Sequence, residues 1–320
     1  MNETLVVMIP AFNEARTIGR VIKLIPRKIK GIRKVKVLVI DDGSTDDTVK
    51  EARKAKADRI VSFPSNKGLG IGFKTGIMNA LKMDADIIVN IDADLQFNPK
   101  DIPELIKPIQ SGEADMVSCS RFARKEFVPE MPLIKKIGNK IVTGIVNFST
   151  GQKFTDTQCG FRAYGRETAL RLNLFGRFTY TQEVFLDLVN KGLRIKEVPL
   201  RVKGERAYGK SKIVSHWYSY GVKALLIIIR SLRDYHPLKF FGGIGLIVFL
   251  LGFVPGLALF VRWLNTGQTS PYTSFIPVSG ALMIIGFLLI VLALIADMLE
   301  RQRKIQEEIL YLARKKEIES

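Results

Sequence analysis

Two aspartates separated by one residue, Asp92 and Asp94, stand at the end of the apolar run Asp86–Ile91. Carboxylate oxygens in this arrangement can hold Mg²⁺ or Mn²⁺ and leave coordination positions open for the oxygens of a diphosphate. Gln96 follows two residues later and adds an amide oxygen. Because surface turns often produce Asp-x-Asp by chance, the motif gains meaning only from its neighbours.

Further polar motifs close the first two predicted strands. Pro10–Glu14 follows the apolar run Leu5–Ile9, and Asp41–Asp46 follows Val37–Ile40. Open α/β sheets bind ligands at the carboxyl ends of their strands. We therefore expect these motifs to lie on the same ligand-binding edge as Asp92–Gln96.

Three later motifs complete the ordered set: Ser120–Phe122, Asp156–Arg162 and Arg206–Lys212. Arginine can grip two phosphate oxygens at once. The ordered set of motifs resembles the family 2 glycosyltransferases of the GT-A fold. Within that family it is most similar to the branch of dolichyl-phosphate mannose synthases and polyprenyl-phosphate glucosyltransferases, over residues 5 to about 230.

The resemblance implies a role for each motif residue. The nucleotide-sugar pocket would be lined by Pro10, Phe12, Glu14, Asp42, Asp92, Ala93, Asp94, Gln96, Arg121, Arg206 and Lys212. Asp94 and Gln96 would hold the metal, Mg²⁺ or Mn²⁺. The catalytic set would be Asp94, Arg121, Arg206 and Lys212, with Asp156 and Glu183 as candidate general bases.

The implied reaction moves a hexose from a UDP- or GDP-sugar to polyprenyl or dolichyl phosphate, with inversion at the anomeric carbon. A lipid phosphate is already ionised near neutral pH, so catalysis reduces to positioning and stabilisation of the leaving group. The alternative acceptor is a hydroxyl of a glycolipid or glycan, which would need a base. A non-enzymatic membrane scaffold is a more distant alternative, and the retained acidic and basic motifs argue against it.

The elements that must position these residues form an α/β domain. Short apolar runs at Leu5–Ile9, Lys36–Ile40, Arg59–Phe63 and Asp86–Ile91 alternate with helices expected near 14–28 and 46–56. This is the βαβ rhythm of a parallel sheet. We assign residues 1–212 to a Rossmann-like nucleotide-sugar domain of the GT-A type.

Two uncharged apolar stretches, Phe240–Val261 and Phe275–Ala296, are each long enough to cross a bilayer as a helix. Basic residues flank the pair, whereas the connector Arg262–Ser274 holds one. By the positive-inside rule, the catalytic domain and both termini are expected to be cytoplasmic. We expect a two-helix anchor at 238–298 and a helical cytoplasmic tail at 299–320.

Two basic amphipathic segments, 131–148 and 213–236, are predicted to lie in the membrane interface, although ordinary packed helices would give the same pattern. Association often stabilises small two-helix anchors, and the resemblance implies a homo-oligomer, namely a tetramer.

The chain has 49 basic and 31 acidic residues, and its net charge of +18 indicates an anionic partner. Membrane lipids explain it better than nucleic acid, for which no motif is present.

Two other readings of the sequence are weaker. Gly204–Ser211 matches the GxxxxGK[ST] phosphate loop, but only about 25 residues separate it from the first span, too few for the strand whose Asp would hold Mg²⁺. Cys119 and Cys159 lack the spacing of a metal site or a disulfide framework, and we expect both to be reduced core residues.

Overall fold

The computed structural model describes residues 3–174, 180–204 and 237–319. The chain forms two compact units, Met1–Ala224 together with Leu310–Ser320, and Leu225–Ile309. Arg206, Lys212 and the predicted interfacial segment 213–236 lie outside the described residues.

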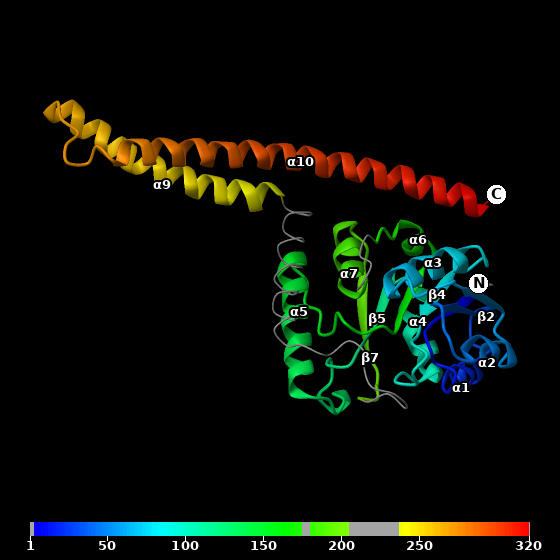
Figure 1. Ribbon diagram of the computed structural model, residues 1–320. Helices are drawn as coiled ribbons and strands as arrows, with labels where there is room; N and C mark the ends of the chain where they lie inside the picture. The colour runs from blue at the N-terminus through cyan, green and yellow to red at the C-terminus, as the bar shows by residue number, and fades with distance from the viewer. Residues whose placement is uncertain (1–2, 175–179, 205–236, 320) are drawn as a thin grey trace. The chain divides into compact units, whose positions relative to one another are not determined.

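A mixed sheet forms the centre of the first unit (Figure 1). Among the described residues its strands are β1 (Glu3–Ala11), β2 (Ile32–Asp41), β3 (Arg59–Ser62), β4 (Ile87–Asn90), β5 (Met116–Ser120), β6 (Arg162–Gly165) and β7 (Ile195–Pro199). They lie in the order β3-β2-β1-β4-β6-β5-β7. Within this sheet only β6 runs antiparallel to its neighbours, β4 and β5.

Helices cover both faces of the sheet. In the first unit they are α1 (Ile18–Leu24), α2 (Thr48–Lys54), α3 (Leu69–Leu81), α4 (Ile102–Gln110), α5 (Leu133–Thr150), α6 (Arg166–Arg171) and α7 (Thr181–Asn190), with short 3-10 turns at Pro99–Asp101 and Lys125–Phe127. Figure 1 shows α1, α2 and α4 on one side of the sheet, and α3 and α6 on the other.

Strand alternation explains the two layers of the core. Val7 and Val39 point toward α1 and α4 and join one large buried apolar cluster with Ile22 and Leu105. Met8, next to Val7 in β1, points to the opposite face, where Gly76 of α3 packs against it so closely that a Cβ would collide. Burial of these side chains is the main favourable contribution to the stability of the unit.

The predicted strands of the amino-terminal half are confirmed as β1 to β4. The helix expected near 14–28 is shorter, because it begins only at Ile18. Asn13 adopts a left-handed φ of 55°, and the Glu14 backbone N–H donates to Thr48 Oγ1 at 2.8 Å, so tertiary contacts hold this stretch out of the helix.

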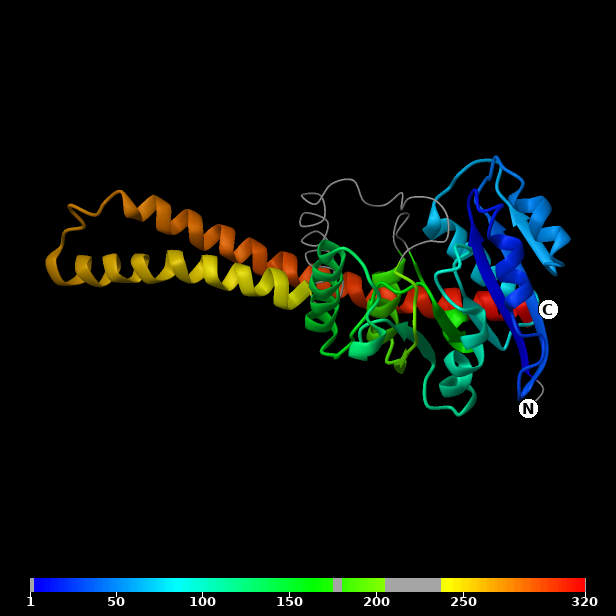
Figure 2. The ribbon, with the colours of Figure 1, turned by 90° about the horizontal axis from the view of Figure 1, so that it is seen from below.

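The second unit consists of two long helices, α9 (Pro237–Thr266) and α10 (Phe275–Glu319), the latter ending in the first unit. Both are long and apolar enough to cross a membrane, and only a small share of each apolar window is buried inside the protein. Figures 1 and 2 show them side by side as an antiparallel hairpin. The segment 299–319, predicted to be a helix, continues α10 without a break.

Glycines allow the two helices to approach closely. A Cβ on Gly252 of α9 would lie 2.6 Å from the carbonyl oxygen of Ser279, and one on Gly245 would lie 2.9 Å from that of Gly286. Small residues at such crossings are typical of helix pairs in membranes, where close backbone packing replaces the hydrophobic effect.

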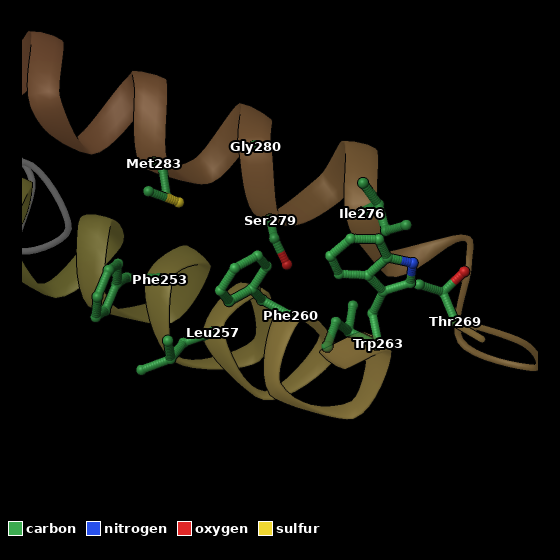
Figure 3. A pocket seen from close by; sticks show the side chains of 11 residues that line it. Phe253, Leu257, Phe260, Trp263, Thr269, Ile276, Ser279, Gly280 and Met283 are labelled. Carbon is green, nitrogen blue, oxygen red and sulfur yellow. The ribbon is translucent and has the colours of Figure 1, made fainter. Parts of the chain in front are cut away.

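Near the connection between α9 and α10, apolar side chains line a cleft (Figure 3). Its walls include Phe253, Phe260 and Trp263 of α9, and Ile276 and Met283 of α10. Each predicted site residue that the structure describes lies outside this lining, so the cleft shares none of them.

Candidate active site

The predicted motifs that the structure describes gather at one edge of the sheet. β1, β2, β4, β5 and β7 all end there, and the antiparallel strand β6 begins there. Asp42, Asp92, Arg121 and the Gly160–Phe161 segment therefore come to the same edge from distant parts of the chain. The expectation that the motifs after the strands share one edge is confirmed.

The loops after β1 and β2 are hydrogen-bonded to each other. The Asn13 backbone N–H donates to Ser44 Oγ at 2.9 Å, and the Thr45 N–H donates to Asn13 Oδ1 at 2.8 Å. Thr17 Oγ1 donates to Glu14 Oε2 at 3.0 Å, just before α1. These contacts fix the backbone that carries Pro10, Phe12 and Glu14, three of the residues expected in the nucleoside pocket.

Asp42 fixes the loop that leads into α3. Its carboxylate accepts from the backbone N–H groups of Lys67 at 2.7 Å and Gly68 at 3.0 Å. Gly43 has a φ of +74°, and a Cβ there would lie 2.6 Å from the backbone of Ser65. Because each carboxylate oxygen has two acceptor sites, the predicted contact of Asp42 with a base or ribose remains compatible with this arrangement.

The Asp-x-Asp loop forms a tight turn directly beyond β4. Asp94 is 3% exposed, and its Oδ1 accepts from the Gln96 backbone N–H at 3.0 Å. Leu95 between them has a left-handed φ of 62°, which is uncommon for a residue with a side chain. Asp92 is half-buried, and Ala93 is buried. The turn therefore holds the Asp94 carboxylate and the Gln96 amide on one short stretch of backbone.

Gly160 lies close to the Asp92 carboxylate. A Cβ on Gly160 would lie 3.0 Å from Asp92 Oδ2 and 3.3 Å from Oδ1. The carbonyl oxygen of Gly160 accepts from Asn90 Nδ2 at 2.8 Å. Asn90, fully buried at the end of β4, thus ties the segment before β6 to the strand that carries the Asp-x-Asp loop.

Asn90 also connects this edge to α7. Its Nδ2 donates to the hydroxyl oxygen of Tyr180 at 3.1 Å. The Tyr180 ring stacks on Phe73 of α3 with centroids 4.0 Å apart. Burial raises the pKa of Tyr180 well above its usual value, and the nearby charge of Asp92 adds to the effect, so the hydroxyl stays neutral. Glu183, a candidate base, stands one turn further along in α7 and is half-buried.

Arg162 is fully buried at the start of β6. Its Nη1 donates to the Thr181 carbonyl at 2.8 Å and its Nη2 to the Thr157 carbonyl at 2.9 Å. The guanidinium also lies 4.8 Å from the ring centroid of Phe185. Arg162 therefore joins the loop before β6 to the beginning of α7.

Arg121 and Asp156 form a two-point ion pair. Arg121 Nε lies 2.6 Å from Asp156 Oδ2, and Nη2 lies 2.9 Å from Oδ1. Burial alone would lower the pKa of Arg121, but its hydrogen bonds with Asp156 and that residue's charge outweigh it and raise the pKa. Arg121 is thus a permanent cation whose planar side chain is held in one orientation.

Glu197 of β7 holds the Asp156 loop in place. Its carboxylate accepts from the backbone N–H groups of Thr155 at 2.8 Å and Asp156 at 2.8 Å. Burial raises the pKa of Glu197, although these hydrogen bonds oppose the shift. Asp156 is thus held by Glu197 on one side and pairs with Arg121 on the other, and its expected role as a general base stays a prediction.

Gln96 contacts the chain that leads toward the last basic motif. Its backbone oxygen accepts from the Lys203 N–H at 3.0 Å, and its Nε2 lies 3.3 Å from the Lys203 carbonyl oxygen. In the sequence, Arg206 follows Gly204 by two residues. Arg206 and Lys212 themselves lie outside the described residues.

The donor atoms at this edge fit a hard divalent cation. Asp94 provides a buried carboxylate and Gln96 an amide, both oxygen ligands of the kind that Mg²⁺ and Mn²⁺ prefer. Within the described parts of the chain, no group of three or more His, Cys, Asp or Glu side chains could hold a metal by itself. The metal site expected at Asp94 and Gln96 stays a prediction.

Five further residues of the site were not predicted from the sequence: Asn90, Gly160, Arg162, Tyr180 and Glu197. Gly160 and Arg162 stood inside a recognised motif, but only the fold reveals what they touch. Cys119 and Cys159 are free and buried, as expected.

The sheet and its Asp-x-Asp edge define a GT-A-like fold. It superimposes on glucosyl-3-phosphoglycerate synthase from Mycobacterium tuberculosis in complex with Mn²⁺, UDP and phosphoglyceric acid, with a TM-score of 0.55 and 23% identity, covering 72% of this chain and 77% of that one. Residues 6–171, more than half of the chain, match the model for glycosyl transferase family 2. The chain belongs to this family and is a glycosyltransferase.

Two curated relatives extend the comparison. A UDP-N-acetylglucosamine–dolichyl-phosphate N-acetylglucosaminyltransferase of Methanococcus voltae is 29% identical over 213 residues, covering 61% of this chain and 83% of the relative. The glycosyltransferase AglJ of Haloferax volcanii is 27% identical over 308 residues, covering 94% of this chain and 97% of the relative. Because the second similarity covers 94% of this chain, it extends into the region of α9 and α10.

Proposed function

We propose that this chain transfers a hexose from a UDP- or GDP-sugar to polyprenyl or dolichyl phosphate, with inversion at the anomeric carbon. The observation that carries the choice of acceptor is the position of α5. This helix packs its inner side against the Asp156 loop, where Thr143 Oγ1 accepts from the Thr157 backbone N–H at 3.2 Å. Its outer side leaves large apolar residues uncovered next to lysines.

The outer side of α5 is suited to a lipid. Leu133 is 71% exposed and Phe148 is 77% exposed, and Ile134, Ile137 and Ile141 are also exposed between them. Lys135 and Lys140 lie on the same helix and are exposed. A helix of this kind can rest in the membrane interface, with its lysines near lipid phosphates. The acceptor phosphate would then arrive beside Arg121.

Each site residue has a role in this proposal. Pro10, Phe12, Glu14 and Asp42 bind the nucleoside, and Asp92 and Ala93 contact the sugar nucleotide. Arg121, Arg206 and Lys212 place positive charge around the phosphates, and Asp156 keeps Arg121 oriented. Because the phosphate nucleophile is already ionised, these residues have to align it with the anomeric carbon and stabilise the departing nucleoside diphosphate.

Asp94 and Gln96 would hold Mg²⁺ or Mn²⁺. When bound, the metal would neutralise charge on the leaving diphosphate. The M. tuberculosis synthase, whose structure contains Mn²⁺ and UDP, supports a divalent metal for this fold. The name of the M. voltae relative supports a lipid phosphate as acceptor.

We also propose that α9 and α10 anchor the protein as two membrane spans, with the catalytic domain, the tail and both termini in the cytoplasm. The asymmetric distribution of basic residues around the spans supports this orientation. The segment 213–236 would lie in the interface before the first span. A homo-oligomer, expected as a tetramer, remains part of the proposal.

The deciding experiment supplies purified full-length protein with radiolabelled UDP- and GDP-sugars and with dolichyl or undecaprenyl phosphate. Reactions contain Mg²⁺, Mn²⁺ or EDTA. Metal-dependent labelling of the lipid with one donor would establish the reaction and identify the sugar. Donor hydrolysis without a lipid product, or transfer to glycolipid hydroxyls, would reject the lipid-phosphate acceptor.

Two variants test the proposed roles of Asp94 and Arg206. Asp94→Ala is expected to abolish metal-dependent transfer, and Arg206→Ala to reduce it by about 100-fold or more, through loss of charge stabilisation in the transition state. Arg301→Ala is a matched control, because Arg301 is an exposed arginine in α10 that pairs with Asp297 of the same helix. Full activity in either site variant would remove that residue from the mechanism.

A further inference from the structure

The carboxyl-terminal segment Tyr311–Glu317 of α10 belongs to the first unit and is bound to α6 and α3. Tyr311 is buried, its hydroxyl donates to Glu167 Oε2 at 2.7 Å, and its ring lies 3.9 Å from the Arg171 guanidinium carbon. Glu317 forms an ion pair with Lys82, at the end of α3, at 2.8 Å. The segment therefore makes specific contacts at both ends.

Arg314 binds the carbonyl end of α6. Its Nη1 donates to the carbonyl oxygens of Leu170 at 3.1 Å and Leu172 at 2.8 Å, where α6 ends. The last carbonyls of a helix have no partner within the helix. Leu172, which follows α6, turns into an extended conformation with a φ of −64° and a ψ of 120°. Arg314 thus supplies the donor, and a positive charge, that this helix end requires.

The end of α6 is in turn fixed to α7. Lys191 Nζ donates to the Arg171 carbonyl oxygen at 2.6 Å and lies 2.8 Å from Asp187 Oδ1. Asp187 Oδ2 accepts from the Asn173 backbone N–H at 3.2 Å. α7 is a single helix from Thr181 to Asn190, so Asp187 and the start of the helix belong to one hydrogen-bonded element.

A second path leads through α3. Arg314 lines a small cavity with Phe73, Ile77, Leu172 and Leu174. Phe73 stacks on Tyr180, which accepts the hydrogen bond from Asn90 beneath the Asp-x-Asp loop. The contacts through α6 and α7 and the contacts through α3 thus both lead from Arg314 to the part of the site around Tyr180. The loops after β1 and β2, in contrast, are held by hydrogen bonds to each other.

We propose that Arg314 is a positioning residue for the transfer reaction, acting through the end of α6 to hold Tyr180 and the start of α7 against the Asp-x-Asp loop. The expected change in kcat rests on the proposed function, whereas the expected loss of protection from hydrogen exchange does not. The carboxyl-terminal segment, which lies beyond the part of the chain that matches the family model, thereby becomes part of the catalytic unit.

The test compares full-length wild type, Arg314→Ala and Arg314→Lys in the same detergent or nanodisc. Lys316→Ala is the matched control, because Lys316 is an exposed cation in the same helical turn. Hydrogen–deuterium exchange should show faster exchange of residues 172–174 and 181–184 in Arg314→Ala and unchanged exchange in Lys316→Ala. Arg314→Lys, which keeps a cationic donor, should restore part of the protection.

Kinetics give the second readout. Arg314→Ala is expected to lower kcat about tenfold and to leave the donor KM within about twofold of wild type, since the nucleoside side is held separately. Unchanged exchange in Arg314→Ala, or an equal loss of protection in Lys316→Ala, would overturn the positioning role. If the wild-type chain transfers no sugar to a lipid phosphate, the proposed function fails, and the exchange experiment still decides the structural role.

Discussion

Gly160 lies directly against the carboxylate of Asp92, so that even a methyl group at this glycine would stand 3.0 Å from Oδ2. Asp92 is the first carboxylate of the Asp-x-Asp loop, and Gly160 belongs to a segment that arrives nearly 70 residues later, held by Asn90 Nδ2. The position of Asp92 thus depends on a residue that has no side chain.

Gly160→Ala is therefore expected to lower kcat by about tenfold or more, because small displacements of positioned groups are costly in transfer reactions. Gly19→Ala is the control, since a Cβ at Gly19 of α1 would make only ordinary contacts, the nearest at 3.7 Å from the Glu51 carbonyl oxygen. Steady-state kinetics with both variants test the prediction. Equal activity of Gly160→Ala and Gly19→Ala would show that Asp92 tolerates the displacement.

Asn90→Asp is expected to lower the melting temperature and kcat together. The substitution keeps the shape of the side chain but removes both amide hydrogens that reach Gly160 and Tyr180, and an unmet buried hydrogen-bonding group costs about 1–3 kcal/mol. Tyr180→Phe removes only one of the two partners and keeps the stack on Phe73, so its effect should be smaller. Thermal unfolding in detergent ranks the stability of wild type, Tyr180→Phe and Asn90→Asp. An Asn90→Asp variant as stable as wild type would contradict the prediction.

Arg121→Lys is expected to lower turnover by at least about tenfold, although the charge is retained. Lysine cannot reproduce the two-point contact with Asp156 that fixes the plane of the guanidinium. Arg194→Lys is a matched control, because Arg194 forms a similar pair with Asp115 in front of β7, on an exposed surface. A similar loss of activity in both variants would point to a general effect on folding.

Glu183→Gln should reduce turnover less than about tenfold, because an ionised phosphate acceptor requires no general base, whereas loss of an essential base costs about 100-fold or more. Donor binding, measured separately by calorimetry, should be unchanged. A collapse of turnover with intact donor binding would favour a hydroxyl acceptor.

The raised pKa of Glu197 predicts opposite effects of acid on stability and activity. An acid whose pKa is raised by folding adds stability below its unfolded pKa, and this contribution is lost as the pH rises through the folded pKa. Activity should change the other way, since protonation weakens the contacts that hold the Asp156 loop. As the pH is lowered, activity should begin to fall while the pH is still above 4.5, the usual pKa of Glu, because the pKa of Glu197 is raised. A Glu197→Gln variant should not show this loss of activity at low pH. If its pH–activity profile were identical to that of wild type, Glu197 would be excluded as the cause of the loss.

The sequence predicted those parts of the fold that local patterns determine. Apolar runs located β1 to β4, and the motifs that end them located Asp42, Asp92 and Asp94 on one edge. β6 could not be predicted in this way, because its four residues form no periodic pattern and its antiparallel direction depends on pairing with β4 and β5. The helix after β1 was predicted too long because the contact between Glu14 and Thr48 joins residues from two loops.

The supporting residues of the site were hidden for the same reason. Asn90 stands in an otherwise apolar strand, and Glu197 in a short strand beside a lysine, so neither has a local signal of function. Their roles arise from partners that are distant in sequence, as when Glu197 holds Thr155. Tyr311 and Arg314 likewise follow a predicted membrane span, and no local pattern connects them with α6.

The antiparallel direction of β6 brings the two ends of one long segment, 121–161, to the same edge of the sheet. β5 ends and β6 begins at the same edge, where Ser118 pairs with Arg162 and the Cys119 N–H donates to the Phe161 carbonyl at 2.9 Å. The excursion 121–161, which carries Arg121, Asp156 and α5, therefore leaves the sheet and returns to it at adjacent points. Under the proposed function, a change of acceptor would therefore be sought in α5, within a segment whose two ends are already joined by strand pairing, while β1 and β2 with the nucleoside motifs stay unchanged.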